Sequence, residues 1–268
     1  RVIPVETGSF EDNPPTLADF TKRDLRWCQG NMQYWPILGW RGLRPTSRFQ
    51  ILAAIMMYLS APAWMLMTGA AASKMVTGDP GVDLALGMAM FFVMIAVSMV
   101  PKLMGLLDVA LTRGGAARYG GRARLALGGL TELVFSMLLA PVVALRVTIF
   151  LGGLVFGRKM AWGGQNRDAY ALSWAEAARG LWPQTLAGVA LGGGIVALVG
   201  PATLAWAAPM VAGLGLAIPF AVVTAVPAVG AWARRAGLCA VPEEVARVDV
   251  LDALDTAPPE LRPAPQAA

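Results

Sequence analysis

The chain has 268 residues, of which 56% are hydrophobic and only 15% are charged, and its mean hydropathy is +0.57. A water-soluble domain of this length needs more polar surface to cover its core, so the composition predicts an integral membrane protein. The formal net charge of +5 does not indicate nucleic-acid binding, because the basic residues stand in short loops between apolar segments. There they are expected to act as topology signals and as contacts for lipid head groups.

A polar segment, residues 1–48, precedes the first long apolar run. The chain opens at Arg1 without a charged-then-apolar leader, which predicts a piece of a longer protein without a signal peptide. Residues 2–5 suit an edge strand, and Thr16 is a suitable N-cap for the helix that follows. The aromatic and basic residues at positions 35–48 are typical of a helix that lies at the membrane interface.

The helix predicted after Thr16 carries a cationic and aromatic face. Arg23, Arg26 and Trp27 stand at positions i, i+3 and i+4, so two guanidinium groups and one indole share a face. A guanidinium can bind a diphosphate through two parallel hydrogen bonds, and an indole can pack against the C–H face of a pyranose, so this face suits a sugar diphosphate. The same residues are typical of any cytoplasmic flank of a membrane span, and spacing alone leaves both interpretations open.

Two long apolar segments, residues 49–73 and 82–111, follow. Each exceeds the roughly 20 residues that a helix needs to cross a bilayer. The turn between them holds one Lys, whereas residues 112–124 hold four arginines among glycines. Because basic residues gather on the cytoplasmic side, the first turn is predicted to lie outside and the second inside.

The next apolar segment, residues 125–157, is interrupted by a glutamate, a proline and an arginine. If it crossed the bilayer, six later basic residues would lie outside, so the charge rule favours an interfacial or re-entrant helix. Residues 183–200 and 204–232 then form a second hairpin, which completes four crossings and leaves both termini in the cytoplasm. Glycine clusters in this hairpin predict closely packed helices.

Residues 158–182 are predicted to form a cytoplasmic loop that leads into a helix capped by Ser173, with Glu176 in the capping-box position. A glycine pair beside an aromatic and a basic residue is able to close over an anionic ligand. A plain solvated linker is the alternative. The Pro-rich and acidic residues 241–268 predict an extended or disordered tail.

Three ionisable residues, Lys102, Asp108 and Glu132, are candidates for lining a polysaccharide path through the membrane. Lys102 and Asp108 lie near the cytoplasmic end of their segment, where snorkelling or mutual pairing is the alternative.

Residues 23–27 read R-D-L-R-W and resemble the Q-x-x-R-W motif of membrane-embedded family 2 glycosyltransferases, the processive synthases of cellulose, chitin and hyaluronan type, with Arg23 in the Gln position. Residues 9–14 and the longer string 23–31 resemble one branch more closely, the glucans biosynthesis glucosyltransferase H family, which makes the backbone of osmoregulated periplasmic glucans. Further matches follow in order at residues 58–62, 101–103, 119–121, 138–141 and 173–177.

The resemblance implies a mainly α-helical integral membrane fold. It implies four transmembrane helices within residues 49–240, cytoplasmic interfacial helices, and a remnant of an upstream GT-A type α/β domain within residues 1–48. Trp27 would be the platform for the acceptor sugar, while Arg26 and Arg23 would hold the diphosphate of UDP. In the loop, the Phe, Thr and Lys positions of the gating loop F-x-V-T-x-K would be taken by Trp162, Gln165 and Arg167.

By the same resemblance, the protein is a hexosyltransferase of the bacterial inner membrane that polymerises glucose from UDP-glucose into a β-glucan and exports it. A divalent cation, Mg²⁺ or Mn²⁺, is expected, with its ligands and the catalytic base outside this chain, so residues 1–268 alone are predicted to be inactive. Expected partners are UDP-glucose, the growing glucan, membrane lipids and a periplasmic glucan-processing protein. Two alternatives stay open: another family 2 polysaccharide synthase, and a non-catalytic four-helix scaffold or transporter.

Overall fold

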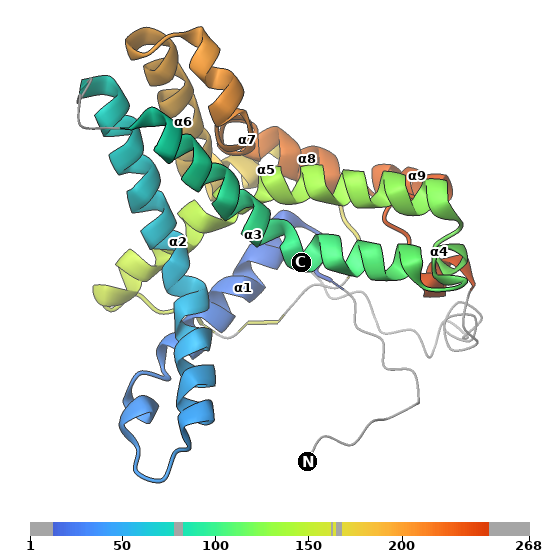
Figure 1. Ribbon diagram of the computed structural model, residues 1–268, viewed down its shortest axis with the longest axis horizontal. Helices are drawn as coiled ribbons and strands as arrows, with labels where there is room; N and C mark the ends of the chain where they lie inside the picture. The colour runs from blue at the N-terminus through green and yellow to red at the C-terminus, as the bar shows by residue number, and fades with distance from the viewer. Residues whose placement is uncertain (1–12, 78–82, 162, 165–167, 247–268) are drawn as a thin grey trace.

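A computed structural model of the chain describes residues 13–77, 83–161, 163–164 and 168–246 (Figure 1). These residues form helices and turns, and no β-strand occurs among them. The edge strand expected at residues 2–5 and most of the expected tail lie outside the described residues. The prediction of a mainly α-helical chain is therefore confirmed for the part that the structure describes.

Helix α1 (Leu17–Met32) begins where the sequence predicts. The Oγ1 atom of Thr16 accepts a hydrogen bond from the backbone N–H of Asp19 at 3.2 Å, which satisfies one of the free donors of the first turn. Asp19 also places a carboxylate in that turn, near the positive end of the helix dipole.

The helix predicted at the membrane interface over residues 35–48 does not form as one continuous helix. The chain makes only a 3₁₀ turn, η1 (Pro36–Gly39), before α2 (Pro45–Thr77) begins. Gly42, with φ of +88°, takes a left-handed conformation that a helix cannot contain. Arg48 therefore lies at the start of the first long apolar helix, where its guanidinium donates to the carbonyl of Trp40 at 3.1 Å.

Four helices are long and apolar enough to cross a membrane, by length and composition. Three of the predicted crossings are among them, and so is the segment expected to be interfacial or re-entrant. The last predicted span is a bent helix pair that passes the same test only when its two helices are taken together, as a broken span or a re-entrant loop, so the described residues hold four candidate spans, or five if this pair is one span. The four are α2, α3 (Leu84–Leu111), α5 (Arg122–Val155) and α6 (Trp174–Leu198).

Helices α3 and α5 form an arm that leaves the main group of helices. Figure 1 shows the later part of α3 and the first part of α5 side by side, with the short helix α4 (Gly115–Arg118) at the tip. The arm runs across the directions of α2 and α6. This orientation agrees with an interfacial position for part of α5, which stays a prediction.

Helix α6 joins two elements that the sequence analysis treats separately. The capping box predicted at Ser173 is present, since its Oγ binds the N–H of Glu176 at 3.2 Å and the carboxylate of Glu176 binds the N–H of Ser173 at 3.1 Å. The helix then continues without interruption through Pro183 into the third expected span.

The last predicted span, residues 204–232, is wrong as a single helix. After a 3₁₀ turn, η2 (Pro201–Thr203), the helical stretch breaks at Leu216 with a bend of 62°. Pro219 explains the break, because its ring lacks an N–H for the carbonyl of Gly215 and would collide with it in a continuous helix. The segment forms α7 (Leu204–Gly215), α8 (Ala217–Thr224) and α9 (Pro227–Ala236), followed by the short α10 (Pro242–Val245).

Close packing of α6 on this broken segment depends on glycines, as predicted. A Cβ atom at Gly188 would lie only 2.6 Å from the carbonyl carbon of Leu214. A Cβ atom at Gly213 would lie 2.8 Å from the Cγ of Pro141 on α5. Small residues therefore let the backbones of three helices approach one another, which is how helices pack in lipid.

The substitution Gly188→Ala should lower the melting temperature of the protein in detergent by at least about 5 °C, because one backbone must move away from the other. Gly193→Ala is the matched control, since nothing lies within 4 Å of a Cβ atom there. Equal melting temperatures for the two variants would contradict this account of the packing.

Candidate functional site: the polar faces of helix α1

The buried face of α1 anchors the motif helix to the spans. Leu25 and Cys28 are buried against Tyr58 of α2 and against Val147 and Leu151 of α5. Cys28 has no exposed surface, and burial, together with a nearby carboxylate, raises the pKa of its thiol to about 12. Cys28 is therefore a packing residue without nucleophilic character at neutral pH.

A polar contact supports the same face. The phenol of Tyr58 donates to the Oδ1 atom of Asp24 at 3.2 Å. Burial raises the pKa of Asp24, while this hydrogen bond and the charge of Arg23 oppose the rise. The second residue of the R-D-L-R-W string thus joins α1 to the first span.

The second face of α1 carries Trp27, whose side chain is 51% exposed. The guanidinium carbon of Arg23 lies 4.8 Å from the centre of the Trp27 ring and 5.4 Å from that of Phe20, so the cation rests on two aromatic rings. Its Nη2 atom also donates to Oδ1 of Asn13 at 3.1 Å. These contacts hold the indole beside a fixed positive charge while leaving much of it open.

Arg26 has a different partner. Its Nη1 atom donates to the carbonyl oxygen of Gly163 at 2.9 Å, in the loop between α5 and α6. The structure therefore brings Arg23 and Trp27 together, and it directs Arg26 toward the loop.

Two further contacts fasten the loop to α1. The side-chain amide of Gln29 accepts a hydrogen bond from the N–H of Met160 at 2.7 Å and reaches the carbonyl of the same residue at 3.5 Å. The phenol of Tyr170 donates to Oδ2 of Asp19 at 2.7 Å. Burial raises the pKa of Tyr170, and the carboxylate of Asp19 raises it further, so the phenol keeps its proton at neutral pH.

The three contacts define a direction for the loop. Met160 lies at Gln29, Gly163 at Arg26 and Tyr170 at Asp19, so the loop follows α1 in the opposite direction. From position 29 to position 19, α1 advances about 15 Å. Asp19, Gln29 and Tyr170 were not predicted as site residues from the sequence. The sequence did carry a signal for Asp19 and Gln29, because both stand at helical spacing from Arg26 and therefore lie along the same stripe of α1.

The three gating-loop candidates, Trp162, Gln165 and Arg167, lie outside the described residues. The described residues on both sides of them lie against α1. Their gating role stays a prediction.

The candidates for a polysaccharide path are partly paired. The Nζ atom of Lys102 on α3 lies 2.7 Å from a carboxylate oxygen of Glu132 on α5 and donates to Oγ of Ser136 at 2.7 Å. These contacts join α3 to α5 within the arm. The partner of Lys102 is thus Glu132, whereas the alternative paired it with Asp108, and a role of these residues in lining a path stays a prediction.

No group of three or more His, Cys, Asp or Glu side chains is arranged to hold a metal ion in the part of the chain that the structure describes.

Taken together, a cationic and aromatic helix is seated on long apolar helices, with a loop from between two of those helices laid along it. This arrangement defines an α-helical integral membrane protein with a polar site on an attached helix.

Comparison with known proteins finds similarity to one family. The chain is 35% identical over 265 residues to a glucans biosynthesis glucosyltransferase H of Pseudomonas putida, and the match covers 92% of this chain and 31% of that protein. Proteins of the same name from Xanthomonas campestris pv. campestris and Vibrio cholerae are 33% and 34% identical over 91% and 89% of this chain, covering 40% and 35% of their own lengths. Over most of its length the chain is therefore similar to one part of the glucans biosynthesis glucosyltransferase H proteins, as the resemblance predicted.

The chain spans about a third of the length of these relatives: 31%, 40% and 35%. No protein-family model and no solved structure matches it.

The substitution Tyr170→Phe should loosen one end of the loop, because a hydrogen bond to a charged carboxylate is worth about 1.5–3 kcal/mol. Amide hydrogen exchange at residues 168–173 should become about tenfold faster or more. Tyr34→Phe is the control, since no hydrogen bond to its hydroxyl occurs among the described residues. Unchanged protection in Tyr170→Phe would show that the phenol does not hold the loop.

Proposed function

We propose that this chain is the membrane part of a processive glucosyltransferase that extends a β-glucan from UDP-glucose at the polar faces of α1. The names of the relatives support transfer of glucose in glucan synthesis. The single observation that carries the assignment to α1 is the exposed Trp27 ring with Arg23 at 4.8 Å, one residue from an arginine that reaches a loop.

Trp27 would bind the acceptor end of the glucan. An exposed indole offers a flat apolar surface to the C–H face of a sugar ring. The neighbouring cation of Arg23 holds the indole ring in one orientation. A fixed platform accelerates transfer by holding the acceptor hydroxyl close to the donor sugar.

Arg26 would bind the diphosphate of UDP. In the structure its guanidinium donates to a neutral backbone carbonyl, that of Gly163. A diphosphate is a stronger acceptor, because hydrogen bonds between two charged groups are shorter and roughly twice as strong as neutral ones. Binding of the nucleotide would therefore free Gly163 and couple the leaving group to the position of the loop. The contact assists catalysis only if it strengthens as the glycosidic bond breaks.

Arg23 would act mainly on Trp27. Its contacts to the Trp27 and Phe20 rings and to Asn13 fix the indole, and its charge adds to the field that attracts the diphosphate. This role suits a position at which the Q-x-x-R-W motif has an uncharged Gln.

The apolar helices would carry the product through the bacterial inner membrane toward the periplasm, with both termini of this chain in the cytoplasm. The concentration of Arg between α3 and α5 and at the end of α9 supports this orientation. A divalent cation with ligands elsewhere in the enzyme, and a periplasmic protein that processes the glucan, belong to the same proposal.

In the full-length enzyme, Trp27→Ala should lower the yield of polymer from UDP-glucose at least about 100-fold, because the acceptor loses its platform. Trp182→Ala is the control, since Trp182 is similarly exposed, at 59%, on α6. Polymer yield would be measured with radiolabelled UDP-glucose in membranes with equal amounts of enzyme. Normal elongation by Trp27→Ala would remove the acceptor assignment.

Residues 1–268 expressed alone should not transfer glucose, since the proposal places the catalytic base and the metal ligands elsewhere. The purified piece would be incubated with UDP-glucose and Mg²⁺ or Mn²⁺, and released UDP would be measured. Turnover above that of a Trp27→Ala version of the same piece would contradict this prediction.

A further inference from the structure

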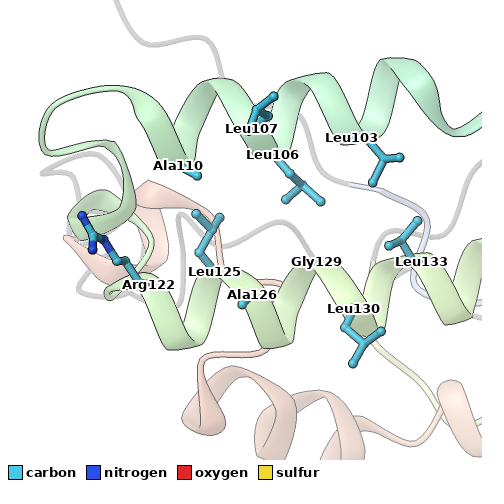
Figure 2. A pocket seen from close by; sticks show the side chains of 10 residues that line it. All are labelled: Leu103, Leu106, Leu107, Ala110, Arg122, Leu125, Ala126, Gly129, Leu130 and Leu133. Atoms are coloured by element: carbon cyan, nitrogen blue, oxygen red, sulfur yellow. The ribbon is translucent and has the colours of Figure 1, made fainter.

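An apolar groove runs between the later part of α3 and the first part of α5. It encloses about 500 Å³ and has leucines on both walls. Figure 2 shows Leu106 and Leu125 between the two helices, with Leu103 and Leu133 farther along the same groove. Gly129 deepens it, since a Cβ atom there would lie 2.9 Å from Leu106.

Arg122 closes one end of this groove and is its one charged lining residue. It belongs to the turn at the tip of the arm, where four exposed arginines occur within 12 residues and no acidic residue stands among them. The four are Arg113, Arg118, Arg122 and Arg124.

The C-terminal end of α9 adds to the positive charge at the tip of the arm. The backbone of Gly237 lies against the side chain of Arg124, since a Cβ atom there would be 2.8 Å from its Cδ. Arg234 and Arg235, in the last turn of α9, are exposed and lie within three residues of Gly237. None of the six arginines forms an ion pair with a carboxylate in the described part of the chain.

We propose that this groove is a binding site for one anionic phospholipid, with an acyl chain between α3 and α5 and the phosphate at Arg122. Three observations support this occupant. The walls are aliphatic, both helices are apolar enough to lie in a bilayer, and the only charged lining residue belongs to a cluster of arginines that form no ion pair within the described part of the chain. Basic residues at a membrane surface attract anionic lipids by about 1 kcal/mol each.

A second copy of the chain fits the groove less well. Symmetric dimers place the same surface patch on both subunits. A symmetric contact over this groove would bring two copies of the cationic turn near each other, which like-charge repulsion opposes. A phospholipid supplies both the apolar chain and a negative charge.

Native mass spectrometry of the delipidated full-length protein in detergent would test the site. Dioleoyl phosphatidylglycerol is added at increasing concentrations, and dioleoyl phosphatidylcholine provides the same acyl chains without net negative charge. Phosphatidylglycerol should bind at least about fivefold more tightly, the factor expected for about 1 kcal/mol from one basic residue. Equal binding of the two lipids would overturn the role of the arginines.

Two variants separate the parts of the site. Arg122→Gln should weaken phosphatidylglycerol binding about fivefold, and it leaves the fold undisturbed because the side chain is exposed. Ala126→Phe should block the groove from within, since Ala126 lines it. Arg44→Gln and Ala123→Phe are the matched controls, exposed positions outside the lining.

Binding weakened about fivefold in Arg122→Gln and blocked in Ala126→Phe, with wild-type binding in both controls, would support the proposal. Unchanged binding in Ala126→Phe would overturn it, because the acyl chain would then lie elsewhere. Displacement of the lipid by soluble glycerol 1-phosphate at the same concentration would also overturn it, since the groove would add nothing. None of these readouts depends on glucosyltransferase activity.

Discussion

The seating of α1 on the apolar helices is the contact on which the polar site depends. Leu25 and Cys28 are buried against α2 and α5, and Leu17 enters a second cluster with Val142 of α5 and Ala221 of α8. An α-helix has 3.6 residues per turn, so burying these positions fixes the direction of every other side chain on α1. Trp27 and Arg23 are turned outward as a consequence.

The face of α1 that carries Asp19, Arg26 and Gln29 contacts the loop between α5 and α6, which is distant in sequence. Gln29 and Met160 are 131 residues apart, and Asp19 and Tyr170 are 151 apart. Gly163, which stands between these two contacts in the loop, lies at Arg26. In the proposed enzyme, an anion that takes Arg26 away from Gly163 would act on a segment already held in place. Its effect would then be a local shift of the loop, a small change that one guanidinium can drive.

The sequence predicted features that depend on neighbouring residues. Both N-caps, at Thr16 and Ser173, are local hydrogen bonds between residues three apart, and the long apolar helices follow from composition. Residues 204–232 were predicted as one span, although Pro219 was recognised as able to break a helix; the break falls at Leu216 because a proline removes the hydrogen bond to the carbonyl four residues earlier. The loop contacts were missed because the helical spacing of Asp19, Arg26 and Gln29 marks a stripe on α1 and does not indicate which distant segment lies against it.

The sequence identified Arg23, Arg26 and Trp27 as candidate site residues, but it did not predict which partner each side chain contacts. Positions i and i+3 of a helix differ in direction by about 60°. That angle lets Arg23 and Arg26 share a broad face and still reach different partners, an aromatic ring and a loop carbonyl. A Q-x-x-R-W string therefore identifies the helix, and only tertiary contacts assign each side chain its partner.

The length of α5 bears on how the arm meets the membrane. Its 34 residues extend about 51 Å, well beyond the roughly 30 Å of hydrocarbon in a bilayer. Arg122 is the first residue of the helix, and Arg146 lies 24 residues later, about 36 Å along it. The guanidinium of Arg146 donates a hydrogen bond to the carbonyl of Gly180 at 2.6 Å. If α5 stood upright, these two arginines would be on opposite sides of the bilayer. If α5 lies along the surface, as its direction across α2 in Figure 1 suits, both stay on the cytoplasmic side with the other basic residues. The charge rule favours the second placement, which stays a prediction.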